Sequence, residues 1–186
     1  GIDGMITVGE MASTDLENCI RYTRTEDHEL SMAFSFHHLK VDYKNGKKWE
    51  LMEPDIAELR RIFCTWQEGM QAGGGWNALF WDNHDQPRAI TRFGGRDGAG
   101  DQDTDWDHVG KMLALCIHLM QGTPYIYQGD ELGMTNPGYS SITQFRDVES
   151  LNAYRALTGE GSTAAREIGG QHASDMAGGS APDEAI

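Results

Sequence analysis

Four short apolar runs alternate with four segments of helical character, and this alternation constrains the fold more than any other feature. The runs are brief and rich in apolar or aromatic residues, as expected of strands covered on both faces. They span Met5 to Val8, Met32 to Phe36, Ala78 to Trp81 and Thr123 to Tyr127. Strands that alternate with helices build parallel sheets through βα units. The sequence therefore predicts an α/β protein.

The helical segments carry start and stop signals. Thr14 to Glu17 resembles a capping box that opens a helix ending near Tyr22, and Asp55 is expected to start a second helix. Apolar residues at spacings of three and four predict the buried face of this second helix, namely Ile56, Leu59, Phe63, Trp66 and Met70. The glycines at 73–75 are expected to end it.

Two further helices are predicted later in the chain. The third runs from about Trp106 to Met120, and a fourth from about Val148 to Leu157. On the third, the residues expected on one apolar side are Val109, Met112, Leu113, Cys116, Leu119 and Met120. After Gly159, large apolar residues almost vanish, so residues 160–186 are expected to be a disordered tail.

Charge and cysteine content exclude several classes of function. With 29 acidic and 15 basic residues, the net charge of −14 opposes binding to nucleic acid or to an anionic membrane surface. No apolar run approaches the ~18 residues needed to span a bilayer. Cys19, Cys64 and Cys116 all fall in predicted helices and are interpreted as reduced, buried thiols of a cytoplasmic protein. A neutral small molecule is the favoured ligand.

Polar clusters directly follow three of the four apolar runs: Glu10 after the first, residues 82–88 after the third, and residues 128–131 after the fourth. The carboxyl ends of strands form the substrate face of a parallel barrel. Carboxylates there can donate protons or stabilise a cationic transition state, as glycosidic bond cleavage requires. The residues alone leave other interpretations open. Glu10 could be a solvated loop residue or a helix cap, and the His84–Asp85 pair could be only a turn. Asp130 and Glu131 are expected to brace a loop.

Three motifs, in the right order, resemble the α-amylase superfamily. Residues 81–88 (Trp-Asp-Asn-His-Asp-Gln-Pro-Arg), followed by Arg-Phe-Gly at 92–94, are similar to its fourth sequence region. Thr-Val-Gly-Glu at 7–10 is similar to its third region, and residues 122–131 resemble the strand that closes its barrel. The resemblance covers about residues 5 to 157. It implies that residues 1–159 are the C-terminal half, strands five to eight, of a (β/α)8 TIM barrel.

The resemblance also implies roles for individual residues. Glu10 matches the general acid/base, and Asp85 matches the carboxylate that stabilises the transition state. His84 matches a hydrogen-bond donor to the sugar in the −1 subsite, and Arg88 lies beside it as a substrate-binding residue. The family's nucleophile stands at the end of the fourth strand, before the point where this sequence begins. We therefore expect the chain to be inactive alone and to pair with an N-terminal half-barrel or with itself.

The subfamily resemblance is to trehalose-6-phosphate hydrolases, and it rests on residues 36–43 and 72–81. It implies a retaining α-glucosidase that releases glucose and glucose 6-phosphate. The densest basic cluster follows the second predicted strand and consists of Lys40, Lys44, Lys47 and Lys48. Local cations suit a sugar phosphate, and Lys40 is the expected phosphate contact. The same lysines also fit a solvated hairpin at Asn45-Gly46.

Other functions remain open at this stage. An oligo-1,6-glucosidase or dextran glucosidase would keep the same fold and mechanism. The chain could also be a non-catalytic remnant that acts only with another chain, or an inverting hydrolase using Glu10 and Asp85 alone. Neither a cofactor nor a metal is implied. Beyond about residue 168 the sequence departs from the family pattern.

Overall fold

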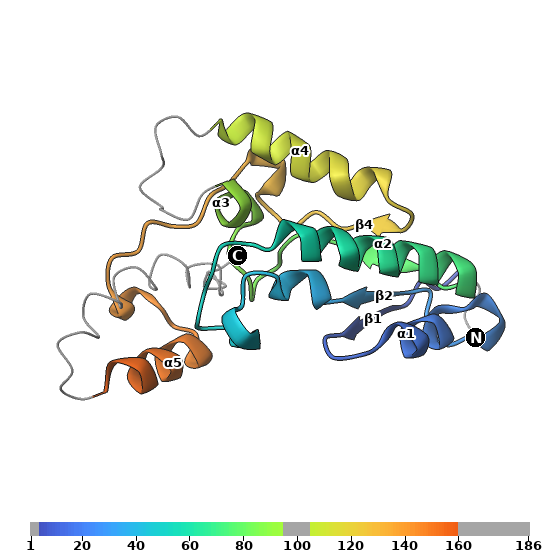
Figure 1. The fold of residues 1–186 in the computed structure, drawn as a ribbon, viewed down its shortest axis with the longest axis horizontal. Coiled ribbons are helices and arrows are strands. Elements are labelled where there is room, and N and C mark those ends of the chain that lie inside the picture. Colours follow the sequence, from blue (N-terminus) through green and yellow to red (C-terminus); the bar gives the residue numbers. More distant parts are fainter. Residues whose placement is uncertain (1–3, 95–104, 160–186) are drawn as a thin grey trace. The chain divides into compact units, whose positions relative to one another are not determined.

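The structure, a computed structural model, describes residues 4–94 and 105–159 (Figure 1). In these residues the strands are β1 (Val8–Met11), β2 (Met32–Ser35), β3 (Asn77–Leu79) and β4 (Thr123–Pro124). The α-helices are α1 (Leu16–Thr23), α2 (Ile56–Gly73), α3 (Ala89–Gly94), α4 (Trp106–Leu119) and α5 (Val148–Thr158). Short 3₁₀ helices are η1 (Thr25–Asp27), η2 (His37–Lys40), η3 (Lys44–Gly46), η4 (Asp130–Leu132) and η5 (Ile142–Gln144). The tail expected at 160–186 lies outside the described residues.

The chain divides into two compact units. The first lies within residues 1–81 and 114–126 and holds the sheet with α1 and α2. The second lies within residues 82–113 and 127–186 and holds α3, η4, η5 and α5. Helix α4 contributes its residues up to Leu113 to the second unit and the rest to the first.

A four-stranded parallel sheet forms the centre of the first unit, in the order β1-β2-β3-β4. This confirms the predicted α/β character. The expected run from Met5 to Val8 was placed three residues too early, because Val8 is the residue that pairs with Met32 at the start of β2. Ahead of the strand, Met5 and Ile6 are 58% and 71% exposed. Apolar composition alone does not reveal where a strand finds its partner.

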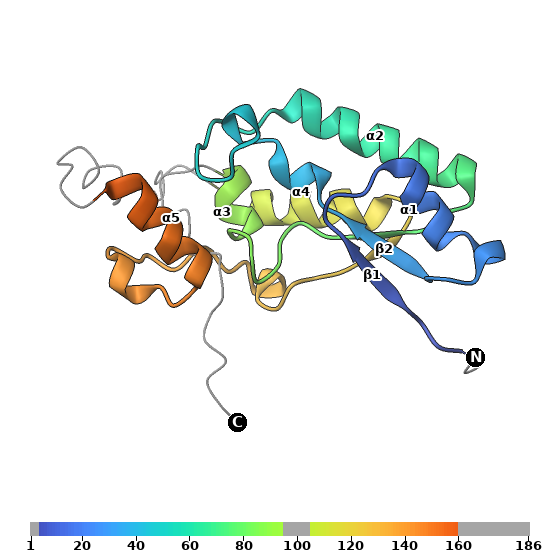
Figure 2. The same ribbon diagram turned by 90° about the horizontal axis from the view of Figure 1, so that it is seen from below.

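Helices α1 and α2 pack together on one face of the sheet (Figure 2). Their shared core with the sheet consists of Cys19, Ala33, Trp66 and Met70. Gly69 allows this close approach, because a Cβ atom there would lie 2.3 Å from Leu16 Cδ2. Burying apolar surface of this kind stabilises a fold by roughly 25 cal/mol per Å². The two helices therefore cover this face of the sheet and stabilise it.

The ends of these helices confirm one predicted cap and correct another. Asp55 accepts a hydrogen bond from the backbone N–H of Glu58, so it caps α2 as predicted, and Gly74, with φ of 74°, ends the helix. The cap of α1 is Asp15, which accepts from the N–H of Asn18, and not Thr14. Asp15 is the N-cap residue because its carboxylate accepts from an N–H in the first turn that the Thr14 hydroxyl does not contact.

Three expectations about buried faces were wrong. Ile56, in the first turn of α2, is 61% exposed because the helix enters the core only at Leu59. Cys64 is exposed, whereas Cys19 is buried as expected. On α4 the buried residues are Leu113 and Ile117, while Met112 and Leu119 are 58% and 76% exposed. The long apolar run of α4 satisfies more than one helical face, so periodicity did not fix which one is buried.

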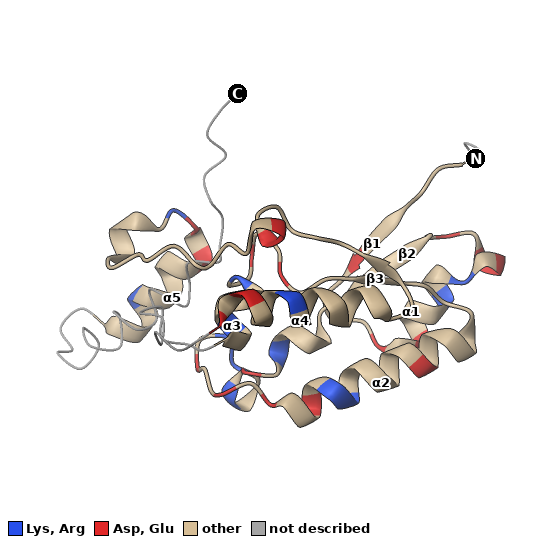
Figure 3. Ribbon diagram, turned by 90° about the horizontal axis from the view of Figure 1, so that it is seen from above, with Lys and Arg blue, Asp and Glu red and all other residues tan. Residues whose placement is uncertain are grey.

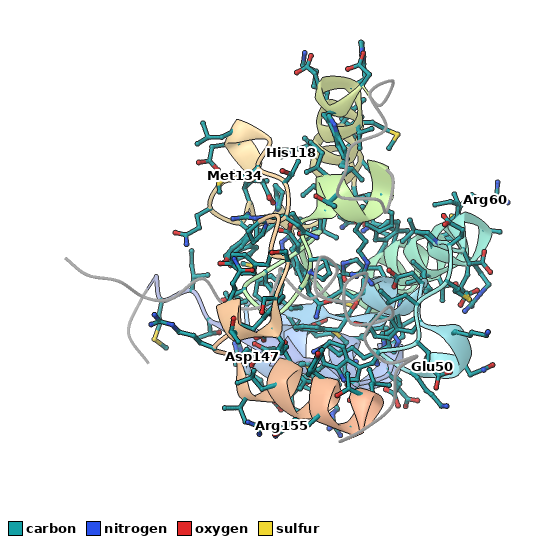
Figure 4. All side chains as sticks on the ribbon, turned by 90° about the vertical axis from the view of Figure 1, so that its left-hand side faces the viewer. Glu50, Arg60, His118, Met134, Asp147 and Arg155 are labelled. Atoms are coloured by element: carbon teal, nitrogen blue, oxygen red, sulfur yellow. The ribbon has the colours of Figure 1, made fainter. Side chains whose placement is uncertain are left out.

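In the second unit, α5 was predicted from the sequence and α3 was missed. α5 begins after Asp147, which caps it by accepting from the N–H of Ser150 at 2.6 Å (Figure 4 labels Asp147 and Arg155 on this helix). α3 was not predicted, because its six residues are too short to show a helical period. It directly follows the polar loop after β3 and therefore positions the next residues of interest.

Candidate active site

Glu10 lies inside β1, with its side chain on the face of the sheet opposite α1 and α2. Side chains alternate along a strand: Met11 packs against the helix-side core, whereas Val8 and Glu10 are exposed. Gly9 lies on the helix side, where an added Cβ would meet Leu30 Cδ1 at 2.5 Å. Glu10 was expected directly after the first strand, and the structure corrects this placement, since its backbone pairs with Phe34 of β2 within β1.

Aromatic rings share this face of the sheet with Glu10. Phe34 makes edge-to-face contacts with Phe80 and Tyr125, at ring-centroid distances of 5.1 and 4.7 Å, and Phe36 lies 5.2 Å from Phe80. Rings of this kind offer surfaces on which the apolar faces of sugars can stack. A carboxyl group beside aromatic rings at the carboxyl end of a parallel strand is suited to acid/base chemistry on a sugar.

The loop after β3 belongs to the second unit and presents His84 and Asp85 to solvent. The Asn83 side chain accepts from the backbone N–H of Asp85 at 2.9 Å, which forms an Asx turn. His84 Nε2 lies 3.4 Å from Asp85 Oδ2, and the two side chains are 65% and 60% exposed. These two predicted site residues are thus brought together, on a turn held by its own polar contacts.

Arg88 is held more tightly than the exposed turn before it. Its Nη1 donates to the Gln128 carbonyl at 2.7 Å and to Asp130 Oδ1 at 3.2 Å, and its guanidinium lies 4.5 Å from the centre of the Tyr127 ring. Nη2 is 4.0 Å from the sulfur of Met134, which Figure 4 labels. Only 13% of the Arg88 side chain is exposed. Asp130 thus braces a loop, as expected.

Asp82 was not singled out from the sequence, yet it is 3% exposed and structurally central to this loop. Its Oδ2 accepts from the N–H of Ala89 at 2.7 Å, at the start of α3. Burial raises the pKa of Asp82 to about 7, and the negative charge of Asp130 and a hydrogen bond between the two carboxyl groups act in the same direction. The Ala89 N–H and the Arg88 cation oppose this rise.

Lys40 lies in the first unit, at the end of η2. Its Nζ donates to the Ala12 carbonyl at 3.5 Å. It lines a surface pocket of about 250 Å³ together with His37, Val41, Glu58, Arg61, Ile62, Thr65 and Trp66. Acidic and basic residues both occur along α2 (Figure 3), and Arg61 is paired with Glu58 at 2.6 Å.

The remaining lysines of the basic cluster lie on a hairpin. Tyr43 and Leu51 form an antiparallel bridge, and Asn45 and Gly46 between them both have positive φ. Lys47 pairs with Glu50, and Lys48 lies 5.0 Å from the Trp49 ring centre. These contacts agree with the hairpin interpretation, and they leave Lys40 as the cluster member that lines a pocket.

Comparison with known proteins decides the family. Residues 2–178 match the family described as "Alpha amylase, catalytic domain". The chain belongs to this family. Its relatives include trehalose-6-phosphate hydrolases of Bacillus subtilis (strain 168), 59% identical over 84% of this chain, and of Escherichia coli (strain K12), 54% identical over 85%. The crystal structure of Bacillus licheniformis trehalose-6-phosphate hydrolase matches with a TM-score of 0.78 at 54% identity, covering 88% of this chain and 29% of that one.

The alpha-amylase relatives extend well beyond this chain. The chain spans 27% of the length of the Bacillus subtilis and Escherichia coli enzymes. An oligo-1,6-glucosidase of Halalkalibacterium halodurans also matches, at 43% identity over 84% of this chain and 27% of its own length. The identity is thus higher to the two trehalose-6-phosphate hydrolases than to this oligo-1,6-glucosidase.

Within residues 4–94 and 105–159, no group of three or more His, Cys, Asp or Glu side chains could hold a metal ion. In the same ranges, no helix is long and apolar enough to cross a membrane.

Proposed function

We propose that the chain is part of the catalytic domain of a retaining α-glucosidase that hydrolyses trehalose 6-phosphate to glucose and glucose 6-phosphate. The main support for the chemistry is Glu10, an exposed carboxylate on the aromatic face of the parallel sheet. The main support for the substrate is the 59% identity to the Bacillus subtilis trehalose-6-phosphate hydrolase. The proposal takes β1 to β4 as the fifth to eighth strands of a (β/α)8 barrel and residues 1–159 as its catalytic portion.

Each expected site residue has a role in this mechanism. Glu10 protonates the leaving glycosidic oxygen and later removes a proton from the attacking water. Asp85 stabilises the positive charge that develops on the sugar ring, and His84 donates a hydrogen bond to the same sugar. A retaining reaction also needs a carboxylate nucleophile, which we assign to a part of the full-length enzyme outside these 186 residues. The chain alone is then inactive, and an N-terminal half-barrel or a second copy is its partner.

We assign recognition of the substrate's phosphate group to basic side chains. Lys40 is the proposed phosphate contact, because it lines a pocket in which Arg61 is already paired with Glu58, in a chain of net charge −14. Arg88 stays in the proposal as a member of the substrate-contacting loop. A phosphorylated substrate and thiols kept reduced both agree with a cytoplasmic location, which stays a prediction.

A chimera tests the proposal. The matched segment of Bacillus subtilis trehalose-6-phosphate hydrolase is replaced by the 156 aligned residues of this chain, and release of glucose 6-phosphate from trehalose 6-phosphate is measured beside glucose release from isomaltose. We expect hydrolysis of the phosphorylated substrate, lost in Glu10→Gln and kept in Glu68→Gln, an exposed acid on α2. A preference for isomaltose would favour the oligo-1,6-glucosidase alternative, and a folded but inactive chimera would contradict both.

A further inference from the structure

The second unit contains two carboxyl groups, Asp82 and Asp130, to which the proposed chemistry gives no role and which lie near the Arg88 guanidinium. Asp82, Arg88 and Asp130 come from the loop after β3 and from η4. Asp82 is 3% exposed, and the side chains of Arg88 and Asp130 are 13% and 27% exposed. One guanidinium therefore bonds Asp130 and acts on Asp82 through its charge, in a largely water-excluded place. Such an arrangement costs free energy unless charge and hydrogen bonds are balanced.

The hydrogen bonds of Asp82 show how that balance is reached. Oδ2 accepts from the Ala89 N–H at 2.7 Å, whereas Oδ1 is buried and accepts from no donor in the described residues. Two ionised carboxylates cannot bond each other, but one proton held between Asp82 and Asp130 lets one group donate to the other. The nearby carboxyl group of Asp130 raises the pKa of Asp82, which favours a proton between the two groups. Among the described residues, the charged groups that act on the Asp82 carboxyl are Asp130 from η4, which raises its pKa, and Arg88 from the same loop, which lowers it.

The same residues tie two loops together. The Arg88 guanidinium holds Gln128 and Asp130, while its backbone N–H donates to Asn136 Oδ1 at 2.7 Å. The Asn136 N–H in turn donates to Thr91 Oγ1 at 2.9 Å. The loop after β3 is thus fixed at several points to the segment after β4. The hydrogen bond between Asp82 and Ala89 closes the stretch of chain that contains His84 and Asp85.

We propose that Asp82 and Asp130 share one proton and, together with Arg88, act as positioning residues that hold Asp85 and His84 in their catalytic orientation. This inference rests on the proposed function for the roles of Asp85 and His84. Loss of the shared proton leaves a buried carboxylate without a donor for Oδ1 and places two negative charges at one cation. Repulsion between the two carboxylates then moves Asp82 away from Asp130, and the turn that carries Asp85 loses its fixed geometry.

The chimera provides the test, with Asp130→Asn, Asp82→Ala and Asp82→Asn as variants. Asp107→Asn is the control, because it removes an exposed acid that pairs with Lys111 on α4 of the same unit. We expect Asp130→Asn and Asp82→Ala to lower kcat about tenfold with KM changed by less than about twofold, since a displaced catalytic group costs rate more than binding. Asp82→Asn is expected to restore most of the lost kcat at pH 6, because its amide oxygen accepts from Ala89 and its NH₂ donates to Asp130.

The pH profile separates this role from a merely structural one. The kcat of the parent chimera should fall as pH rises through about 7, where Asp82 loses its proton, and this decline should be absent in Asp82→Asn. Superimposable profiles for the two proteins, or an Asp130→Asn variant with unchanged kcat, would overturn the inference. An inactive parent chimera would contradict the proposed function instead.

In that case, the shared proton is tested by ¹³C NMR of the aspartate carboxyl groups in this chain. A carboxyl group that titrates near pH 7, is absent in Asp82→Asn and titrates at lower pH in Asp130→Asn supports the shared proton. The absence of such a group refutes it.

Discussion

The backbone N–H of Ala89 lies 2.7 Å from Asp82 Oδ2, so a buried carboxyl group closes the loop that contains Asp85. The pKa of Asp82 is raised to about 7 from its usual 3.8. Between these two values the folded chain holds a proton that the unfolded chain has released. The free energy of unfolding should therefore fall as pH rises across this window.

Unfolding measured at pH 5.5 and pH 8.5 checks this dependence. We expect the parent chain to lose stability at the higher pH and Asp82→Asn to lose less, because its amide cannot ionise. The comparison uses urea midpoints, with Asp107→Asn as the matched exposed control. An equal loss of midpoint in the parent and in Asp82→Asn would show that the buried proton is not on Asp82.

Lys40→Gln tests the phosphate contact. A charge-assisted hydrogen bond to phosphate contributes roughly 1.5 to 3 kcal/mol. In the chimera we expect KM for trehalose 6-phosphate to rise about tenfold or more, with little change for p-nitrophenyl α-glucoside, which has no phosphate. Lys111→Gln, an exposed lysine on α4, is the control. Parallel changes for both substrates would remove Lys40 from phosphate recognition.

Gly122→Ala should destabilise the start of β4. Gly122 has φ of 148°, and a Cβ atom there would lie 2.7 Å from the Asn77 carbonyl oxygen, which belongs to backbone and cannot move aside. Strain and overpacking together cost about 2 to 4 kcal/mol. Gly138→Ala is the control, since nothing lies within 4 Å of its added Cβ. Equal thermal midpoints for the two variants would contradict this account of the turn.

Met70→Ala tests which apolar residues form the core. Met70 is 1% exposed beside Trp66, so its truncation should cost about 2 to 5 kcal/mol. Met112, 58% exposed on α4, should tolerate alanine within about 0.5 kcal/mol. Denaturant midpoints of the two variants give the comparison. A larger loss for Met112→Ala would restore the α4 face that periodicity predicted.

The sequence predicted those features that follow from local physics. Asp55 as a cap, the glycine stop of α2 and the strand-helix alternation all reflect short-range rules, and all are confirmed. The start of β1 was missed because it depends on pairing with Met32, a long-range contact. The buried face of α4 was missed because apolar residues there cover more than one side of the helix.

The residues of the candidate site likewise divide into those with a local sequence signal and those without one. Glu10, His84 and Asp85 were found because they follow apolar runs and match family motifs. Asp82 is adjacent to them in sequence, yet its importance comes from burial and from contacts with Ala89 and Asp130. Contacts of that range leave no local pattern, so sequence reasoning passed over the residue.

The central claim is that Glu10 is the general acid/base of an α-glucosidase, and chemical rescue tests it most directly. Glu10→Ala in the chimera should lower hydrolysis of trehalose 6-phosphate by about 10² to 10⁴-fold. With p-nitrophenyl α-glucoside, whose leaving group needs no protonation, added azide should restore turnover and yield a glucosyl azide, since azide attacks without a general base. Loss of activity with no rescue and no azide product, or activity retained in Glu10→Ala, would contradict this role.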